Sequence, residues 1–376
     1  MRARVRFLGA GLTLGLSLIM VAPAGASAGP MSDAVAPAGS PMLVKAGAFA
    51  ELVEVVDSNG AVHIAAGNDQ DIWYLTNRTG SWTSSKVFAH TASPNGYLWG
   101  QPTIALDEND RVHIAATRFP YGEGDIGIFY ATDKGHPRGT FGTPKRIAAD
   151  GNGEPQLKVY KGHLFLVDVK NWCCVGDGTV VMRTNWTGSW TTATIGRGQE
   201  PSFRMTTDGF ARVAFERGDP PGVGLYFTIA SSHKGNFGSA VKVAGTGASD
   251  SSPILALRGN DAQIVWRHST GGTGNWKLTY ATPSGWHSFL TVPGSTADMA
   301  AAFDVTTTGF GHIGLAGNDV TDSYRCGTPV TWCTETVASD VAATAIALRR
   351  GPHGSVDVAW VQSGDVWFLA ESFSGP

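Results

Sequence analysis

The sequence lacks the features that mark several large classes of protein. It has no run of lysine and arginine, and its formal charge is −3 over 376 residues, so we expect no binding to nucleic acid. It has no phosphate-binding glycine loop, zinc-ligand spacing or nucleophile elbow, so we expect no cofactor and no metal. After the N-terminal segment, no apolar run is long enough to span a membrane.

The N-terminal segment itself has the composition of a signal peptide. An apolar run at residues 8–22 lies between a basic head and the small residues Ala26-Ser27-Ala28. The basic head consists of Arg2, Arg4 and Arg6. We therefore expect residues 1–28 to be removed and the product to be secreted and extracellular. An uncleaved anchor is the less favoured alternative. Loss of the three arginines would change the formal charge from −3 to −6.

Cysteine is also scarce, with four residues in the whole chain. Cys326 and Cys333 occupy the places that Thr76 and Thr83 hold in a similar hairpin, "YLTNRTGSWTSSKV". In that register they face each other, and an exported chain can oxidise them to a disulfide. Cys173 and Cys174 are adjacent, and could form a strained vicinal disulfide, remain thiols, or cross-link to the distant hairpin.

No amphipathic helical pattern occurs, and short alternating segments rich in Val, Ile, Thr and aromatic residues fill the chain instead. Seven such segments align at steps of 50, 52, 48, 51, 49 and 44 residues. They are "AVHIAAG" (from Ala61), "RVHIAAT" (Arg111), "HLFLVDV" (His163), "ARVAFER" (Ala211), "AQIVWRH" (Ala262), "GHIGLAG" (Gly311) and "SVDVAWV" (Ser355). A fixed period near 50 residues indicates a repeat fold.

Each copy predicts four antiparallel strands, which makes the chain an all-β protein and a seven-bladed β-propeller. Six or eight blades are the alternatives. The last copy stops before its fourth strand, and residues 42–48 near the N-terminus could supply it. The N-terminal strand would then join the last blade and close the ring. We therefore expect a flexible lead-in at residues 29–41 and a single domain, a monomer, at residues 42–376.

Recurring residues of the repeat are interpreted as framework. The glycine of the "TGSW" turns permits a tight reversal, and Trp82, Trp190 and Trp332 are expected to pack between blades. His63, His113 and His312 recur in the repeat register, which favours structural positions over metal ligands.

The turn between the third and fourth strands resembles the Asp-box of sialidase-like propellers. "ATDKG" (residues 131–135) has its Asp and Gly, and "SSHKGNF" (residues 231–237) has its Ser, Gly and aromatic residue, with His233 at the Asp position. The chain thus resembles the sialidase-like, BNR-type propeller superfamily, and this implies a propeller fold. The Arg-Ile-Pro motif of sialidases is absent, so sialidase activity is not implied.

Polar residues are predicted to ring one mouth of the propeller. The loops between blades end in "GQP", "GEP", "QEP" and "SSP", which places Gln101, Glu154, Glu200 and Ser252 at the starts of successive inner strands. The second strands end on the same face in Arg118, Lys170, Arg217 and Arg267, with Glu216 and His268 beside them. Charged groups near a central funnel suggest a polar site. The alternative is that these charges pair with one another and close the channel.

Aromatic residues in nearby loops suit a sugar ligand, because flat rings cover the apolar face of a pyranose. They are Tyr97, Trp99, Phe119, Tyr121 and Trp172. Alternatively these rings pack beneath the loops.

The sequence therefore predicts a propeller that binds a glycan or polysaccharide at its mouth. Arg118, Arg217 and Arg267 would bind the ligand, and Trp99, Tyr121 and Trp172 would stack on it. One alternative is an enzyme: a glycoside hydrolase using Glu154 and Glu200 as acid and base, or a lyase in which arginine neutralises a carboxylate and His268 or Tyr121 acts as base. Another alternative is a scaffold that binds proteins.

Overall fold

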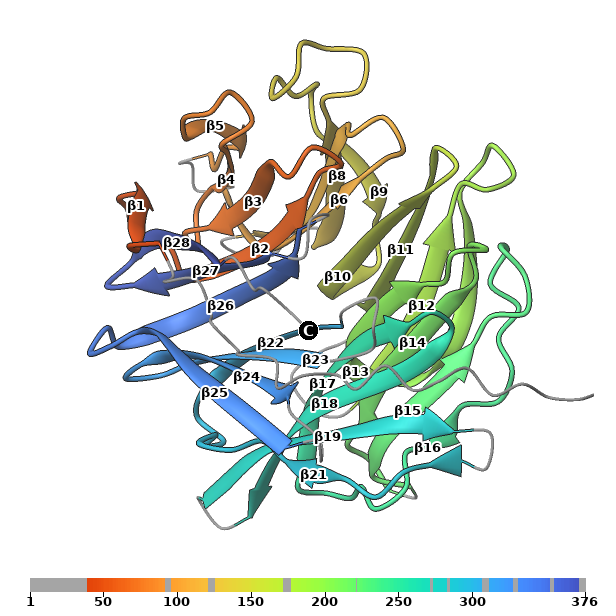
Figure 1. Cartoon of the computed structure of the whole chain (residues 1–376). Helices are drawn as coiled ribbons and strands as arrows, with labels where there is room; N and C mark the ends of the chain where they lie inside the picture. Colours follow the sequence, from red (N-terminus) through yellow and green to blue (C-terminus); the bar gives the residue numbers. More distant parts are fainter. Residues whose placement is uncertain are drawn as a thin grey trace, which may run out of the picture. The chain divides into compact units, whose positions relative to one another are not determined.

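The computed structural model describes residues 39–91, 96–120, 126–171, 177–220, 222–270, 273–282, 285–305, 311–326, 331–351 and 355–371. All regular secondary structure in these ranges is β-strand, and every pairing is antiparallel (Figure 1). The described part of the chain contains no helix long and apolar enough to cross a membrane.

The first two sheets have four strands each, in sequence order. The first contains β2 (Glu51–Val56), β3 (Val62–Gly67), β4 (Ile72–Thr76) and β5 (Thr83–Phe88). The second contains β6 (Tyr97–Leu106), β7 (Val112–Pro120), β8 (Gly127–Thr132) and β9 (Lys145–Ala148). These are the elements that the alternating pattern predicts.

A long strand, β13 (Thr191–Met205), links the next two groups of strands into a seven-stranded sheet. Residues 191–198 pair with β12, and residues 199–205 pair with β14. The strands before it are β10 (Gly151–Tyr160), β11 (His163–Lys170) and β12 (Gly178–Thr184). Those after it are β14 (Ala211–Arg217), β15 (Gly224–Ile229) and β16 (Val241–Lys242). Each half therefore has the four-stranded pattern of the repeat.

The remaining sheets continue this pattern. One contains β17 (Asp250–Arg258), β18 (Asp261–Thr270) and β19 (Thr273–Thr282), with β20 (Gly285–Trp286) and β21 (Leu290–Thr291) both paired to β19. The next contains β22 (Ala300–Val305), β23 (Gly311–Ala316), β24 (Val320–Cys326) and β25 (Thr331–Ala338). The last contains β26 (Ala343–Arg350), β27 (Val356–Gln362) and β28 (Asp365–Glu371).

The N-terminal strand β1 (Met42–Lys45) completes this last sheet, as predicted. Met42 pairs with Phe368 and Leu43 with Trp367 (Figure 1). The first strands of the sheets contact one another in succession, from β2 through β6, β10, β13, β17 and β22 to β26, and β26 contacts β2. No sheet closes on itself in the described ranges.

The core lies between neighbouring sheets. One cluster joins Leu52 and Leu75 of the first sheet to Val361 and Phe368 of the last. Trp82 packs edge-on against Phe368, with ring centres 5.1 Å apart. Burial of these faces is the main stabilising term of such stacked sheets.

Trp332 also packs against a core cluster between sheets. Trp190, by contrast, is 38% exposed, so the prediction that it packs between blades is wrong.

The disulfide between Cys326 and Cys333 is confirmed, with Cα atoms 5.9 Å apart. Its predicted register is wrong. Cys326 pairs with Thr331, and Cys333 pairs with Tyr324, whereas Thr76 pairs directly with Thr83 in the first hairpin. The bond therefore runs diagonally across the hairpin. Cys173 and Cys174 lie outside the described residues.

The repeated histidines are buried framework residues. His63 Nδ1 lies 2.5 Å from the Tyr74 hydroxyl, and His113 Nδ1 lies 2.5 Å from the Tyr130 hydroxyl. His312 is bonded to Asp322 at 2.6 Å. Burial lowers the pKa values of His63 and His113. The described residues contain no cluster of His, Cys, Asp and Glu suited to a metal ion.

Candidate functional site

Four inner strands contain the same irregularity, a β-bulge whose central residue has a left-handed backbone. Its φ is 52° at Gln101, 53° at Glu154, 49° at Glu200 and 51° at Ser252. Each residue precedes a proline, and each coincides with a shift in the pairing register. Non-glycine residues adopt this conformation rarely, at a cost of about 1–3 kcal/mol each. Such bulges redirect side chains next to functional sites.

The side chains at these bulges form a series of hydrogen bonds from one inner strand to the next. We call this series, which consists of Glu51, Gln101, Glu154, Glu200 and Ser252, the belt. The Gln101 backbone N–H donates to Glu51 Oε2 at 2.5 Å, and the Glu154 N–H donates to Gln101 Oε1 at 3.0 Å. The Glu200 N–H in turn donates to the Glu154 carboxylate. The Ser252 N–H donates to Glu200 Oε2 at 2.6 Å. Each bulge exposes one backbone donor, and the equivalent side chain of the preceding inner strand satisfies it.

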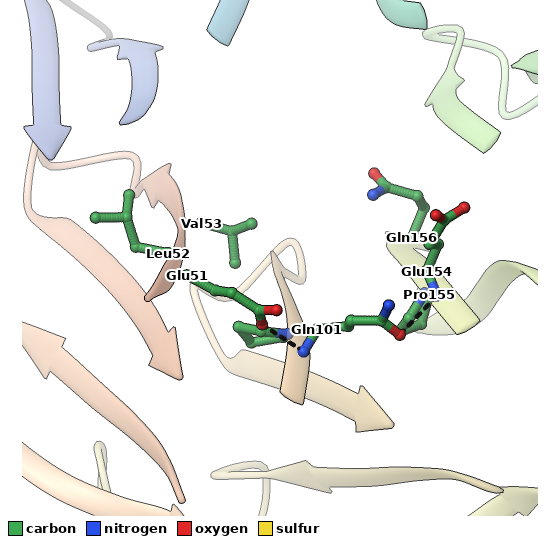
Figure 2. A pocket seen from close by; sticks show the side chains of 8 residues that line it. Glu51, Leu52, Val53, Gln101, Glu154, Pro155 and Gln156 are labelled. Carbon is green, nitrogen blue, oxygen red and sulfur yellow. Dashed lines mark hydrogen bonds between the residues drawn. The ribbon is translucent and has the colours of Figure 1, made fainter. Parts of the chain in front are cut away.

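A pocket of about 220 Å³ lies against the first three of these sheets. Its lining residues are Glu51, Leu52, Val53, Gln101, Pro102, Glu154, Pro155 and Gln156. Figure 2 shows the Glu51 carboxylate directed at the Gln101 backbone, and the Gln101 amide directed at Glu154. The carboxyl group of Glu154 points away from that amide (Figure 2). The belt therefore forms part of the pocket wall.

Three carboxyl groups gather where this wall meets the next sheet: Glu154, Glu200 and Glu216. Burial raises the pKa of Glu154 to about 7, with a further contribution from the negative charge of Glu200. Burial and then Glu200 also raise the pKa of Glu216 to about 7. Glu154 Oε2 and Glu216 Oε2 are buried with no hydrogen-bond partner in the described structure. Two of the three groups therefore keep a substantial protonated fraction near neutral pH.

Glu200 lies in a different environment within this cluster. Its carboxylate accepts the Ser252 N–H at 2.6 Å. Glu216 accepts a bond from the Gln199 amide at 3.1 Å. Carboxyl groups with raised pKa values beside a further carboxyl group are an arrangement that suits acid–base chemistry.

The cations at the ends of the second strands lie over aromatic rings. The Arg118 guanidinium is 4.4 Å from the Phe129 ring centre and 5.1 Å from that of Tyr97. Arg217 is 4.5 Å from the Tyr226 ring centre. Lys170 ends β11 and is half-buried. Stacking holds these guanidinium groups in fixed orientations. A fixed orientation suits both ligand binding and a framework role.

Arg267 and His268 belong to a separate polar group on β18. Arg267 Nε donates to Ser251 Oγ at 3.1 Å. His268 Nδ1 lies 2.8 Å from Asp250 Oδ1, and the imidazole remains about a third exposed. Asp250 also accepts the Trp266 indole N–H at 2.7 Å. The carboxylate thus orients the histidine ring.

Of the three residues predicted to stack on a ligand, the structure describes only Trp99. Trp99 is buried at 3% exposure against Phe88 and Phe129, and its Nε1 donates to the Ala89 carbonyl. The prediction that Trp99 stacks on a ligand therefore does not fit its burial. Tyr97 and Phe119 are half-buried. Tyr121 and Trp172 lie outside the described residues.

Sequence reasoning missed Glu51 and Gln156, which both line the pocket. Glu51 precedes Gln101 by 50 residues, one step of the repeat. It is followed by leucine, so the proline that marks the other mouth positions is missing. The 50-residue step of the repeat alone could have identified Glu51 as a mouth position.

Comparison with known proteins adds information about the fold. No family model matches the sequence, and no curated protein matches it. Several solved structures are similar, all at low identity. An α-L-arabinanase from Penicillium chrysogenum, solved with arabinobiose, has a TM-score of 0.54 at 14% identity, covering 89% of this chain and 98% of that one. The polysaccharide lyase Uly1 has a TM-score of 0.53 at 13% identity, covering 91% of each chain.

A third similar structure is an α-L-arabinofuranosidase from Fusarium graminearum. Its TM-score is 0.51 at 11% identity, covering 73% of this chain and 93% of that one. These neighbours are β-propellers. The likeness, together with the consecutive four-stranded pattern, shows that this chain has a β-propeller type of fold.

Proposed function

We propose that this protein is a carbohydrate-active enzyme, a glycoside hydrolase whose active site is the carboxyl cluster of Glu154, Glu200 and Glu216. The observation that carries the proposal is the cluster of Glu154, Glu200 and Glu216, in which burial and the charge of Glu200 raise the pKa values of Glu154 and Glu216 to about 7, beside the pocket that Glu154 lines. Glycoside hydrolysis needs one protonated and one ionised carboxyl group. Fold neighbours that act on arabinose polymers and on a polysaccharide support this substrate class.

Each group has a specific role in this proposal. Glu154 donates its proton to the leaving glycosidic oxygen, because its raised pKa leaves a substantial fraction of it protonated near pH 7. Glu200 supplies the ionised carboxylate that activates water or attacks the anomeric carbon. Glu216 holds Glu200 in place and shares its charge.

The belt provides a clean way to test these roles. Gln101 accepts a backbone N–H with its amide oxygen, so glutamine can serve as a belt residue. Glu154→Gln and Glu200→Gln should therefore keep the fold while removing the titrating group. We expect each to lower kcat on the substrate by about 10²–10⁴-fold. The matched control is Glu108→Gln, which changes an exposed carboxyl group in a turn.

The assay is a panel of glycans and polysaccharides that includes arabinan and uronic-acid polymers, with bound ligand and released reducing ends measured together. In the pH profile of kcat/KM, the alkaline limb near pH 7 should disappear in Glu154→Gln. Full activity in both variants would refute the assignment. Binding without any product would favour a lectin, and neither binding nor product would favour a protein-binding scaffold.

The His268–Asp250 pair favours a second candidate, a polysaccharide lyase. The carboxylate engages Nδ1, which leaves Nε2 to accept a proton. Arg267, the adjacent residue, could neutralise a uronate carboxylate. Abstraction of the proton next to that carboxylate would expel the sugar leaving group and create a double bond. Unsaturated products, detected by ultraviolet absorbance and lost in His268→Ala, would identify this reaction.

We also propose seven blades in a closed ring. The support is that seven four-stranded groups occur in sequence and that the first strand of each contacts the next, including β26 with β2. The pairing of β1 with β28 supports closure by the two ends of the chain. The Asp-box-like turns support membership of the sialidase-like superfamily.

The boundaries of the mature protein are part of the same proposal. We propose that residues 1–28 direct secretion, that residues 29–41 form a lead-in, and that residues 42–376 form the propeller. The basic head, apolar run and small-residue site in the sequence support this division.

A further inference from the structure

The residue before the bulge at Glu200 makes a direct contact with the carboxyl cluster. Gln199 on β13 lies opposite Glu216 on β14. The side-chain amide of Gln199 donates to Glu216 Oε1 at 3.1 Å. The other carboxyl oxygen of Glu216 is buried and has no hydrogen-bond partner in the described structure. The contact with Gln199 therefore anchors one oxygen of this carboxyl group.

The bulge brings two consecutive residues of β13 toward the same carboxyl group. The chain takes three steps on β13, from Gln199 to Ser202, while it takes two steps on β14, from Glu216 to Ala214. In a regular strand, neighbouring side chains point to opposite faces of the sheet. The extra residue of a bulge breaks that alternation, so Glu200 is free to approach Glu216 from the side of Gln199.

Equivalent bulges in other sheets make contacts of the same kind. In the second sheet, Thr117 occupies the place of Glu216, and its hydroxyl donates to the bulge residue Gln101 at 3.1 Å. In the sheet that begins with β17, Arg267 occupies this place. Its Nε donates at 3.1 Å to Ser251, the residue before the bulge. The position of Glu216 is therefore one from which both residues of the bulge can be reached.

The framework does not require an amide and a carboxyl group at these two positions. The four equivalent pairs are Gly100 with Thr117, Gly153 with Val169, Gln199 with Glu216, and Ser251 with Arg267. Two of the four have glycine at the first position, and one has a carboxyl group at the second. A glutamate with an amide donor opposite it is therefore a particular feature of the sheet region that carries Glu200.

A further carboxyl group fixes the chain that follows Glu216. Asp177 accepts the backbone N–H groups of Gly218 at 2.8 Å and Asp219 at 3.3 Å. The Asp177 N–H in turn donates to the Asp219 carboxylate at 3.1 Å. The position that a Cβ atom would take at Gly218 lies 3.9 Å from Glu216 Oε1 and 4.0 Å from Gln199 Nε2. The backbone is thus held at the point where the amide meets the carboxyl group.

We propose that Gln199 is a positioning residue of the carboxyl cluster, whose amide fixes the orientation of Glu216 beside Glu200. This inference rests on the proposed hydrolase, because it gives Gln199 a part in that active site. Without the amide donor the Glu216 carboxyl group would be free to turn, and Glu200 would lose a fixed neighbour. Gln199 is not among the described residues that line the pocket, so we expect it to act through Glu216.

The first test measures the protonation of Glu216 and needs no substrate. In protein labelled with ¹³C at the glutamate carboxyl groups, the Glu216 resonance is assigned by its absence from Glu216→Gln. Its titration midpoint should lie near pH 7 in wild type. Gln199→Met removes an N–H donor that favours the ionised form, so the midpoint should rise by about one pH unit. Gln199→Lys restores a donor and adds a positive charge, so the midpoint should fall below the wild-type value.

The charges of Glu200 and Asp177, which also act on Glu216, are the same in all these proteins. The matched control is Gln70→Met, which removes an exposed amide between β3 and β4 and should leave the midpoint unchanged. A Glu216 midpoint that is the same in wild type, Gln199→Met and Gln199→Lys would overturn the proposal. If Gln199→Met fails to fold, the fall expected in Gln199→Lys still decides it.

The second test measures hydrolysis of a glycan that the wild type cleaves. Gln199→Met should lower kcat by about 10–100-fold with KM little changed, and Gln70→Met should match wild type. A kcat that Gln199→Met leaves unchanged would also overturn the proposal. Absence of hydrolysis by the wild type would refute the hydrolase itself, and the titration midpoints would still show whether Gln199 orients Glu216.

Discussion

Replacing Glu154 by glutamine should stabilise the protein at neutral pH and leave its stability at acidic pH unchanged. The native pKa of Glu154 is about 7, against an ordinary value of 4.5. Below pH 4.5 both the folded and unfolded states hold the proton, and the stabilising contribution of the neutral group is fully present. As the pH rises toward 7, the unfolded state releases its proton first, so the free energy of unfolding falls.

The size of the effect follows from that difference in pKa. One pKa unit corresponds to 1.36 kcal/mol, which gives a ceiling of about 3.4 kcal/mol for a shift from 4.5 to 7. Glu154 is half-buried and interacts with Glu200, so solvent screening should reduce the gain to about 1–2 kcal/mol. The amide oxygen of glutamine can still accept the Glu200 N–H, which keeps the belt intact.

The measurement is urea unfolding of wild type, Glu154→Gln and the control Glu108→Gln at pH 4.5 and pH 7.5. We expect the Glu154 variant to exceed wild type only at pH 7.5, and the control to match wild type at both. An equal loss of stability in Glu154→Gln at both pH values would refute the reasoning. That result would mean that the ionised carboxylate, through its bond to the Glu200 N–H, stabilises the native state.

Two further predictions concern stability alone. Arg183 is bonded to buried Asp168 at 2.7 and 3.2 Å, so Arg183→Met should lower the free energy of unfolding by about 3–5 kcal/mol. Adding Asp168→Leu should restore most of it, and failure of that rescue in urea unfolding would contradict the ion-pair explanation. The Cys326–Cys333 disulfide closes a short loop, so its reduction should cost about 2–3 kcal/mol. Unchanged unfolding with and without reductant would show that the cross-link leaves the unfolded state unconstrained.

Much of the fold could be predicted from the sequence because its local signals agree with its long-range pairing. Asp57 illustrates this, since its carboxylate accepts the backbone N–H groups of Asn59 and Ala61 and fixes the turn between β2 and β3. Asp107 repeats the arrangement with Asn109 and Arg111. Turns of this kind are specified by residues close in sequence. Alternation in the flanking strands then determines which face is buried.

The candidate site could be predicted only in part, because its details depend on contacts between distant sheets. The burial of Trp99 depends on Phe88 and Phe129, which come from β5 and β8. The raised pKa of Glu216 depends first on its burial and then on how close Glu200 comes from another strand. Neither distance is encoded by spacing along the chain. The diagonal disulfide likewise follows from how β24 and β25 align.

The belt explains why the same polar residues fit both a structural and a chemical role. A strained bulge at Gln101, Glu154, Glu200 and Ser252 frees one backbone donor in each of four inner strands, and a side-chain oxygen from the preceding inner strand accepts it. Accepting this hydrogen bond requires an oxygen atom but no charge, because the neutral amide of Gln101 accepts it. A carboxyl group at the same position satisfies the donor with one oxygen and keeps the other for chemistry. At Glu154 the second oxygen is buried without a partner, which the framework alone does not require.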